Sequence, residues 1–266
     1  MSTVTLYSTS SGASGPRVAF LHGLFGQGRN WTQIARGLAD ISRPTLFDMP
    51  DHGRSGWTQR FDYIGAAEIV AQQMRDIDAQ EPWIVVGHSM GGKIAMLVAL
   101  LHPDLVSRLA VIDISPSPTD DVSEFETFIA GMQAMDLDTI HTRQDADEAL
   151  SAAAPSRSVR GFLLQNLRRE GDTWSWQPNL ELLARDIAEV GGWPGEEVAT
   201  LAPFDEPVLW LSGERSPYVT EESQREMRRL FPRVRHVLVK NAGHWVHSEQ
   251  PEVVITALRA LITTSR

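Results

Sequence analysis

Short apolar runs rich in β-branched residues alternate with helical patterns along most of the chain, and this alternation restricts the possible folds more than any other feature. Unbroken apolar runs are typical of strands that are buried on both faces of a parallel sheet. We predict strands at residues 17–22, 43–48, 83–87, 109–113, 208–211 and 234–239. The alternation indicates an α/β fold, with a mostly parallel, twisted sheet flanked by helices and right-handed crossovers.

The predicted helices lie between these strands. Residues 90–101 are almost wholly apolar, as in a helix packed beneath a sheet, and residues 63–79 place apolar side chains on one face. Asn30 is a candidate N-cap for a helix over residues 31–39, and Pro251 is placed to open the last helix. Each helix therefore has an apolar side that the sheet can cover.

The alternation stops between about Pro116 and Leu201. The patterns there are helical, at residues 124–135, 145–153, 157–169 and 180–190, with one short extended piece at residues 174–176. We predict a core of residues 1–116 and 200–266, with a helical cap (lid) of residues 117–199 inserted into it. The insertion leaves the carboxyl end of a strand, where open α/β sheets bind ligands, so we expect it to cover a site. Simple decoration of the surface is the alternative.

Residues 87–91, Gly-His-Ser-Met-Gly, match the pattern G-x-S-x-G between a buried strand and an apolar helix. This context is that of a nucleophile elbow, which exposes a serine hydroxyl on a sharp turn. We expect the flanking glycines to allow the turn and Ser89 to take a strained conformation. A glycine-rich turn with an incidental serine is the alternative interpretation.

A serine hydroxyl is a weak nucleophile until a base takes its proton. His244, in the stretch Asn-Ala-Gly-His after the last predicted strand, is the candidate base. His247 could substitute for it, although it begins to enter the final helix. His88 belongs to the elbow itself, and we expect its side chain to point away from the site.

The third group is the acid that orients the histidine. Asp113 ends the strand that follows the nucleophile helix, and it is the preferred candidate. Glu214 lies in the loop where the acid more often occurs in such folds, and it is the alternative. The position in that loop at which an aspartate is common, three residues after Gly213, holds Ser216.

Two backbone N–H groups are candidates for an oxyanion hole. One belongs to Met90, at the start of the helix after the nucleophile, and the other to Leu24, after the His22-Gly23 pair that follows an early strand. Apolar side chains are candidates for a substrate pocket, although core packing is the alternative for those of residues 125–132. The pocket candidates are Phe25, Phe125, Phe128, Met132 and Trp245.

Composition excludes several other functions. With Lys+Arg 24 and Asp+Glu 34, the net charge is −10, which argues against nucleic acid as a partner. The chain has no cysteine, which excludes a disulfide framework and a cysteine nucleophile. We expect no metal, no cofactor, no secretory signal in residues 1–15 and no membrane span. The expected protein is cytoplasmic, a monomer or homodimer, and acts on a small-molecule substrate.

Together these motifs resemble the α/β-hydrolase superfamily over essentially the whole chain. Residues 21–26, 87–96, 111–116 and 241–247 resemble the YbfF-type bacterial esterases and their mitochondrial relatives in particular. In that group the triad acid follows the strand after the nucleophile helix, which corresponds to Asp113. The resemblance implies hydrolysis of carboxylic esters, and of acyl thioesters as a second class of substrate.

Two other functions stay open at this point. Related hydrolases of C–C bonds and a menaquinone-pathway-type lyase use the same constellation, but they usually keep the aspartate that Ser216 replaces. A non-catalytic ligand-binding module on this fold often lacks the nucleophile or the base, whereas all three groups are present here. We therefore predict a serine hydrolase of carboxylic esters that acts through Ser89, His244 and Asp113.

Overall fold

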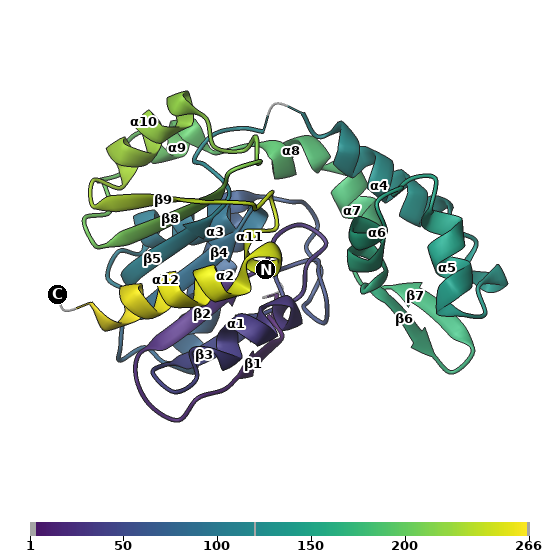
Figure 1. The fold of residues 1–266 in the computed structure, drawn as a ribbon, viewed down its shortest axis with the longest axis horizontal. Helices are drawn as coiled ribbons and strands as arrows, with labels where there is room; N and C mark the ends of the chain where they lie inside the picture. The colour runs from purple at the N-terminus through teal and green to yellow at the C-terminus, as the bar shows by residue number, and fades with distance from the viewer. Residues whose placement is uncertain (1–3, 120, 265–266) are drawn as a thin grey trace.

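The computed structural model describes residues 4–119 and 121–264 and contains a seven-stranded sheet with helices on both faces (Figure 1). Residues 1–3 lie outside the described residues; they belong to residues 1–15, where no secretory signal is expected. The strand order is β1-β3-β2-β4-β5-β8-β9. The strands are β1 (Ser8–Ser10), β2 (Arg17–Leu21), β3 (Arg43–Phe47), β4 (Trp83–His88), β5 (Val106–Ile112), β8 (Val208–Gly213) and β9 (Val234–Val239).

All six predicted strands are present, and the α/β fold class is confirmed. Each neighbouring pair from β3 to β9 is parallel, and only the pairing of β1 with β3 is antiparallel. The sequence did not predict β1, because its three residues, Ser-Thr-Ser, carry no apolar pattern. This strand borders the sheet on one side only, so it does not need the buried side chains of a central strand.

Side chains alternate between the two faces of the central strands, as the two-residue period of a strand requires. In β2, Val18 and Phe20 join the apolar cluster under α1 and α12, whereas Ala19 and Leu21 join the cluster under α2 and α3. Both clusters are buried, which is why the strand sequences are continuously apolar. The helices of the core are η1 (Gly28–Trp31), α1 (Thr32–Arg36), α2 (Tyr63–Ile77), α3 (Met90–Leu101), α10 (Glu221–Leu230), α11 (Val246–Glu249) and α12 (Pro251–Thr263).

Two of these helices differ from the prediction. Asn30 is not an N-cap of α1: it lies inside the 3₁₀ turn η1, and its side chain accepts a hydrogen bond from Gln27 N (2.6 Å). The sequence analysis also missed α10, whose first turn is fixed by a capping box between Thr220 and Ser223. A threonine followed three residues later by a short polar side chain was the available signal.

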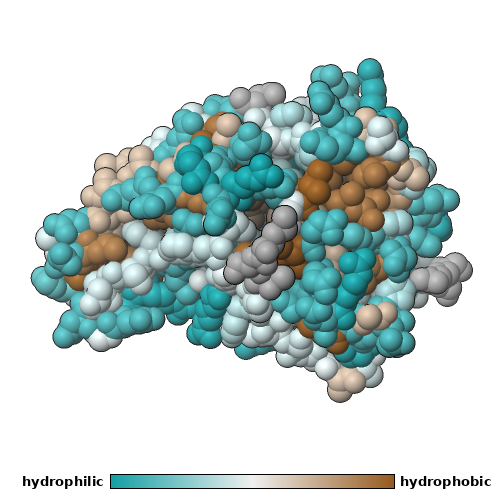
Figure 2. Space-filling model, turned by 180° about the vertical axis from the view of Figure 1, so that it is seen from behind, coloured by the Kyte–Doolittle hydropathy of each residue, from teal (hydrophilic) through white to brown (hydrophobic). Residues whose placement is uncertain are grey.

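Residues 117–119 and 121–199 form a separate layer beside the sheet, reached from the end of β5 and leading back to β8 (Figure 1). Seen from behind, the surface is largely hydrophilic, with hydrophobic patches on both parts of the molecule (Figure 2). The prediction of a cap bounded at these residues stays a prediction. The elements of this insertion are α4 (Ser123–Ala134), η2 (Leu137–Thr139), α5 (Arg143–Leu150), α6 (Arg157–Leu164), β6 (Leu167–Glu170), β7 (Thr173–Trp176), α7 (Leu180–Arg185), α8 (Ile187–Gly191) and α9 (Gly195–Val198).

The predicted helix over residues 157–169 is wrong in its last part. The helix ends at Leu164, and β6 pairs with β7 in an antiparallel hairpin in which Glu170 faces Thr173. The connection is the two-residue turn Gly-Asp, with Gly171 at φ 61°. Glycine tolerates this left-handed conformation, and such a dipeptide between strands is a hairpin signal. The predicted helix over residues 180–190 is also broken, into α7 and α8 at Asp186.

The insertion is fastened to the core by buried polar contacts. Lys93, on α3 and 1% exposed, donates hydrogen bonds to the carbonyls of Gly191 and Gly192, both at 2.7 Å. The hydroxyl of Tyr63, on α2, donates to Val190 O at 2.6 Å. All three acceptors lie at the carboxyl end of α8, where unpaired helix carbonyls attract donors and positive charge. The two helices beneath the sheet therefore hold the end of the insertion in place.

Candidate active site

Ser89 lies at the turn between β4 and α3 with φ 52° and ψ −123°. This conformation is strained for a residue with a side chain, as expected for an elbow. The glycines on either side serve a different purpose from the one predicted, because neither has a positive φ. A Cβ atom on Gly87 would lie 2.2 Å from Gly91 O, and one on Gly91 would lie 2.4 Å from His22 O. Lack of space, not backbone freedom, therefore requires glycine at both positions.

Three side chains that are far apart in the sequence meet at the carboxyl edge of the sheet. Ser89 follows β4, Asp113 follows β5, and His244 follows β9. His244 Nε2 lies 3.0 Å from Ser89 Oγ, and His244 Nδ1 lies 2.7 Å from Asp113 Oδ2. The ring therefore donates to the carboxylate through Nδ1–H and leaves Nε2 free to accept the serine proton.

Asp113 is fully buried, and its carboxylate is compensated by three donors. Oδ1 accepts from Gly213 N at 2.7 Å, and Oδ2 accepts both from His244 and from the hydroxyl of Ser216. Ser216 thus supports the acid from the position where an aspartate is common. Glu214, the alternative acid, accepts from Asn241 N at 3.0 Å and does not contact His244.

Neither of the other two histidines near the triad is placed as the base, and one of them is oriented differently from the expectation. His88 does not point away: its Nε2–H donates to His244 O at 2.8 Å, and the two rings pack with centroids 4.7 Å apart. Burial keeps the pKa of His88 well below its usual value, so the ring is neutral. His247 stacks on Trp31 at 4.5 Å and makes no hydrogen bond to Ser89. The structure therefore places His244, and not His247, against the serine.

The loop after β2 runs directly over the serine. A Cβ atom on Gly23 would lie 3.1 Å from Ser89 Cβ. The two predicted oxyanion donors, Leu24 N–H and Met90 N–H, have no hydrogen-bond acceptor within residues 4–119 and 121–264. Buried N–H groups are normally paired, so two such groups beside a nucleophile are suited to a developing negative charge.

Phe25, the next residue of this loop, has φ 58°, a strained conformation for an aromatic residue. Side chains hold its peptide groups from both sides. Its N–H donates to His52 Nε2 at 3.2 Å, and its carbonyl accepts from Asn166 Nδ2 at 2.7 Å. His52 belongs to the loop after β3, and burial lowers its pKa, which favours the neutral ring that can accept. Asn166 belongs to the insertion. The insertion therefore helps to fix the loop between β2 and η1, which carries the Leu24 N–H and is called the oxyanion loop below.

His22 fixes the start of the same loop. Its Nδ1–H donates to Gly23 O at 2.8 Å, and its Nε2 accepts from Met49 N at 2.9 Å. Burial lowers the pKa of His22 to about 3, so the ring is neutral and uses one nitrogen as donor and the other as acceptor. Asp48 joins the neighbouring loops by accepting from Gly28 N (2.7 Å) and Arg54 N (2.9 Å).

The cavity at Ser89 is small, with a volume of about 30 Å³. Of the predicted pocket residues, Phe25, Phe125, Phe128 and Trp245 line it. Met132 does not: it is fully buried in the apolar core, on the same face of α4 as Phe125 and Phe128 but one turn beyond Phe128. The sequence analysis missed the three lining residues of α6, because a helical pattern does not show which face meets the core. These are Val159, Phe162 and Leu163.

Comparison with known proteins identifies the family. The model of the alpha/beta hydrolase fold family matches residues 16–251. The chain belongs to this family. It is 37% identical to the sn-1-specific diacylglycerol lipase ABHD11 of Mus musculus, over 93% of this chain and 81% of that protein. It is 31% identical to the esterase YbfF of Escherichia coli, over 91% of both chains.

A solved structure agrees with this result. A marine microorganism esterase, 31% identical, superposes with a TM-score of 0.91 over 96% of this chain and 98% of that one. The predicted α/β-hydrolase fold, the resemblance to YbfF-type esterases and the class of carboxylic ester hydrolase are confirmed at this level. Among residues 4–119 and 121–264, no helix combines the length and the apolar character needed to cross a membrane.

Proposed function

We propose that this α/β hydrolase cleaves carboxylic esters through an acyl-enzyme on Ser89, with His244 as the base and Asp113 as the orienting acid. The observation that carries the proposal is the unbroken hydrogen-bond chain from Ser89 Oγ through His244 to the buried carboxylate of Asp113. The names of the relatives, esterases and lipases, support the same bond type. Acyl thioesters are a second substrate class that the same chemistry can cleave.

The first half of the reaction forms the acyl-enzyme. His244 Nε2 takes the proton of Ser89 Oγ as the oxygen attacks the carbonyl carbon. The N–H groups of Leu24 and Met90 donate to the resulting oxyanion, and Asp113 stabilises the imidazolium. When the tetrahedral intermediate collapses, His244 gives its proton to the leaving oxygen or sulfur, and the bond from the acyl carbon to that atom breaks.

The second half repeats these steps with water. His244 takes a proton from a water molecule, whose oxygen attacks the acyl carbon, and the same two N–H groups hold the second oxyanion. Ser89 leaves as its oxygen recovers the proton from His244, and the carboxylic acid is released. The volume of about 30 Å³ at Ser89 holds few atoms, so a short acyl group fits better than a long one.

Turnover of 4-nitrophenyl acetate and butyrate tests the proposal. We expect wild type to hydrolyse both faster than 4-nitrophenyl palmitate, and Ser89→Ala to lose turnover and labelling by a fluorophosphonate. Wild type that is labelled but cleaves no ester would favour a C–C bond hydrolase or a lyase, which a β-diketone substrate would then show. Absence of labelling would favour a non-catalytic binding module.

The predicted partners and location belong to the same proposal. A small-molecule ester is the expected partner, and nucleic acid is not. The monomeric or homodimeric state and the cytoplasmic location stay predictions, which light scattering and fractionation of cells that express the protein would test.

A further inference from the structure

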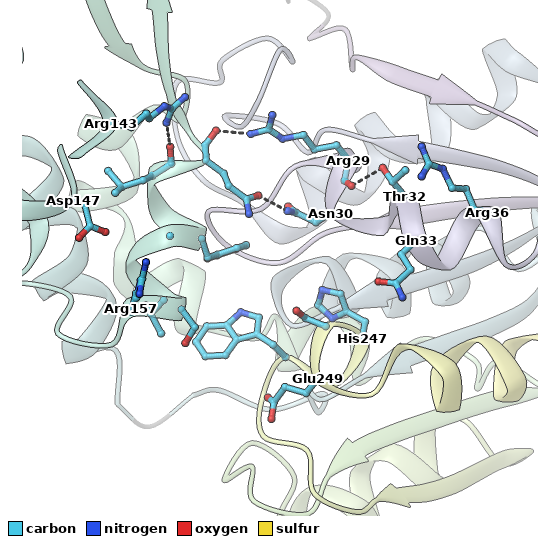
Figure 3. Close-up of a pocket in the computed structure, with 18 residues that line it drawn as sticks. Arg29, Asn30, Thr32, Gln33, Arg36, Arg143, Asp147, Arg157, His247 and Glu249 are labelled. Atoms are coloured by element: carbon cyan, nitrogen blue, oxygen red, sulfur yellow. Dashed lines mark hydrogen bonds between the residues drawn. The ribbon is translucent and has the colours of Figure 1, made fainter. Parts of the chain in front are cut away.

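A large groove adjoins the small cavity at Ser89. Its volume is about 1320 Å³, and it lies between the insertion and the η1–α1 and α11 segments of the core (Figure 3). The rings of Phe162 and Trp245, with centroids 6.2 Å apart, line both spaces. Any part of a substrate that exceeds the small cavity therefore has this groove as its neighbouring space. The residues common to both spaces are Asn30, Val159, Phe162, Trp245 and His247.

Arginine side chains approach this groove from both of its walls. Arg29 and Arg36 come from the core, and Arg143 and Arg157 come from the insertion (Figure 3). None of the four forms an ion pair with a carboxylate within residues 4–119 and 121–264. Four guanidinium groups without a direct ion pair are unexpected in a chain with a net charge of −10, although Asp147 and Asp48 act on Arg157 and Arg29 from a longer distance.

The two carboxylates in the lining do not balance these charges. Asp147 pairs with Arg160 at 2.8 Å, and Glu249 pairs with Arg215 at 3.0 Å. Neither of these arginines lines the groove. Each acidic side chain is thus already neutralised by a cation outside the lining, and the groove keeps an excess of positive charge.

Two of the four arginines also have a structural role, because they donate hydrogen bonds to backbone carbonyls. Arg29 Nη2 donates to Gln165 O and Arg143 Nη1 to Leu164 O, both at 2.5 Å, at the carboxyl end of α6. Burial and then the charge of neighbouring Arg168 lower the pKa of both arginines, and the opposing charge of Asp48 on Arg29 has a smaller effect. Arg36 and Arg157 are exposed, and their side chains make no hydrogen bond to a described residue.

We infer that this groove binds an anionic group, a carboxylate or a phosphate, on the part of the ester or thioester that extends beyond the small cavity. The inference rests on the proposed function and names the substrate class of the same site. Guanidinium groups bind both anions through paired, charge-assisted hydrogen bonds. The excess positive charge also attracts such a substrate from solution, and salt weakens this attraction.

Matched pairs of substrates test the inference. S-butyryl coenzyme A and S-butyryl-N-acetylcysteamine share one thioester, and only the first carries phosphates. Mono-4-nitrophenyl glutarate and 4-nitrophenyl valerate share one leaving group, and only the first carries a carboxylate. We expect KM for the anionic member of at least one pair to be about tenfold lower at low salt, with the difference shrinking in molar salt. The pair that responds identifies the anion as phosphate or carboxylate.

Variants assign the effect to the groove. The KM ratio is the KM of the neutral member of a pair divided by the KM of the anionic member. In the double variant Arg36→Gln/Arg157→Gln, we expect this ratio for the responding pair to fall about tenfold, as in a groove without excess charge. Arg225→Gln with Arg228→Gln, both on α10 and outside the lining, removes the same two charges and should leave the ratio as in wild type. Equal KM values within both pairs, or equal effects of the groove and control variants, would overturn the inference.

The inference and the proposed function fail in different ways. If the neutral esters are hydrolysed but neither pair responds to salt or to the arginine variants, the esterase stands and the anion site does not. If no ester is hydrolysed, the proposed function fails. Calorimetric binding of S-butyryl coenzyme A and mono-4-nitrophenyl glutarate to Ser89→Ala then tests the groove directly, and loss of binding in the Arg36 and Arg157 double variant supports it.

Discussion

At the scale of single residues, the triad acid shows how local signals and spatial contacts combine. Asp113 takes φ 53°, a strained conformation that turns its carboxylate toward the loop after β8. There it gains the Gly213 N–H and the Ser216 hydroxyl as donors in addition to His244. The donors hold the carboxylate in one orientation, and the carboxylate holds the tautomer of His244 that accepts at Nε2.

Replacing the acid tests this arrangement. We expect Asp113→Asn to lower kcat by about 10³-fold or more, because an amide no longer favours the Nδ1–H tautomer. Glu214→Gln is the matched control, since the Glu214 side chain accepts a hydrogen bond from Asn241 N and forms none with His244, and its kcat should stay within a few-fold of wild type. Ester hydrolysis measured alongside circular dichroism separates loss of chemistry from loss of fold. A large fall in kcat for Glu214→Gln alone would show that the acid is misassigned.

At the scale of elements, the insertion contributes to the oxyanion loop as well as to the cavity. Asn166 is fully buried between α6 and β6, and its amide joins Phe25 O to the side chain of Gln27. The strained loop between β2 and η1 is therefore supported by a residue from a different layer of the molecule. Movement of the insertion would change the direction of the N–H groups that precede Phe25.

We predict that Asn166→Ala lowers kcat by about tenfold or more with a smaller change in KM. The bond to Phe25 O is lost, and oxyanion donors act mainly in the transition state. Asn179→Ala is the control, because Asn179 also joins the insertion to the core, through Asp51, without contacting the oxyanion loop. Steady-state kinetics and the rate of fluorophosphonate labelling check the prediction. Equal losses in both variants would mean that Asn166 acts on stability only.

At the scale of the whole molecule, several histidines are buried as neutral groups around the site. His22, His52 and His88 are each at most 4% exposed, and all three are held by hydrogen bonds to backbone groups. Burial lowers the pKa of His22 to about 3 from an ordinary value of 6.5, and it lowers the pKa of the other two. These histidines therefore stay unprotonated in the folded protein at pH values at which they bind a proton in the unfolded chain.

This difference predicts acid sensitivity. Between pH 6.5 and about 3 the unfolded chain binds a proton at His22 and the folded chain does not, so the free energy of unfolding falls as the pH drops below 6.5. Each such histidine contributes a slope approaching about 1.4 kcal/mol per pH unit. Urea unfolding at several pH values between 7 and 5.5 measures this slope. His22→Asn should reduce the slope, whereas exposed His141→Asn should not; identical slopes in all three proteins would refute the prediction.

The patterns in the sequence predicted the fold and most of the chemistry. Continuous apolar runs identified six of the seven strands of the main sheet, because a strand buried on both faces must be apolar throughout. The context of Ser89 between a buried strand and an apolar helix indicated an elbow before any contact was known. Failures occurred where local signals were short or polar, as at β1 and the β6–β7 hairpin.

The sequence by itself determined the α/β class, the elbow and the set of groups able to take part in acyl transfer. Only the tertiary structure decided which of them meet: Ser89 and Asp113 reach His244 across 155 and 131 residues of chain. In the tertiary structure His88 also points toward the site, Met132 lies outside the cavity lining, and arginines of two layers line one groove. The physical reason is that periodicity and turn residues express local preferences, whereas a site depends on sheet order and on packing between distant segments.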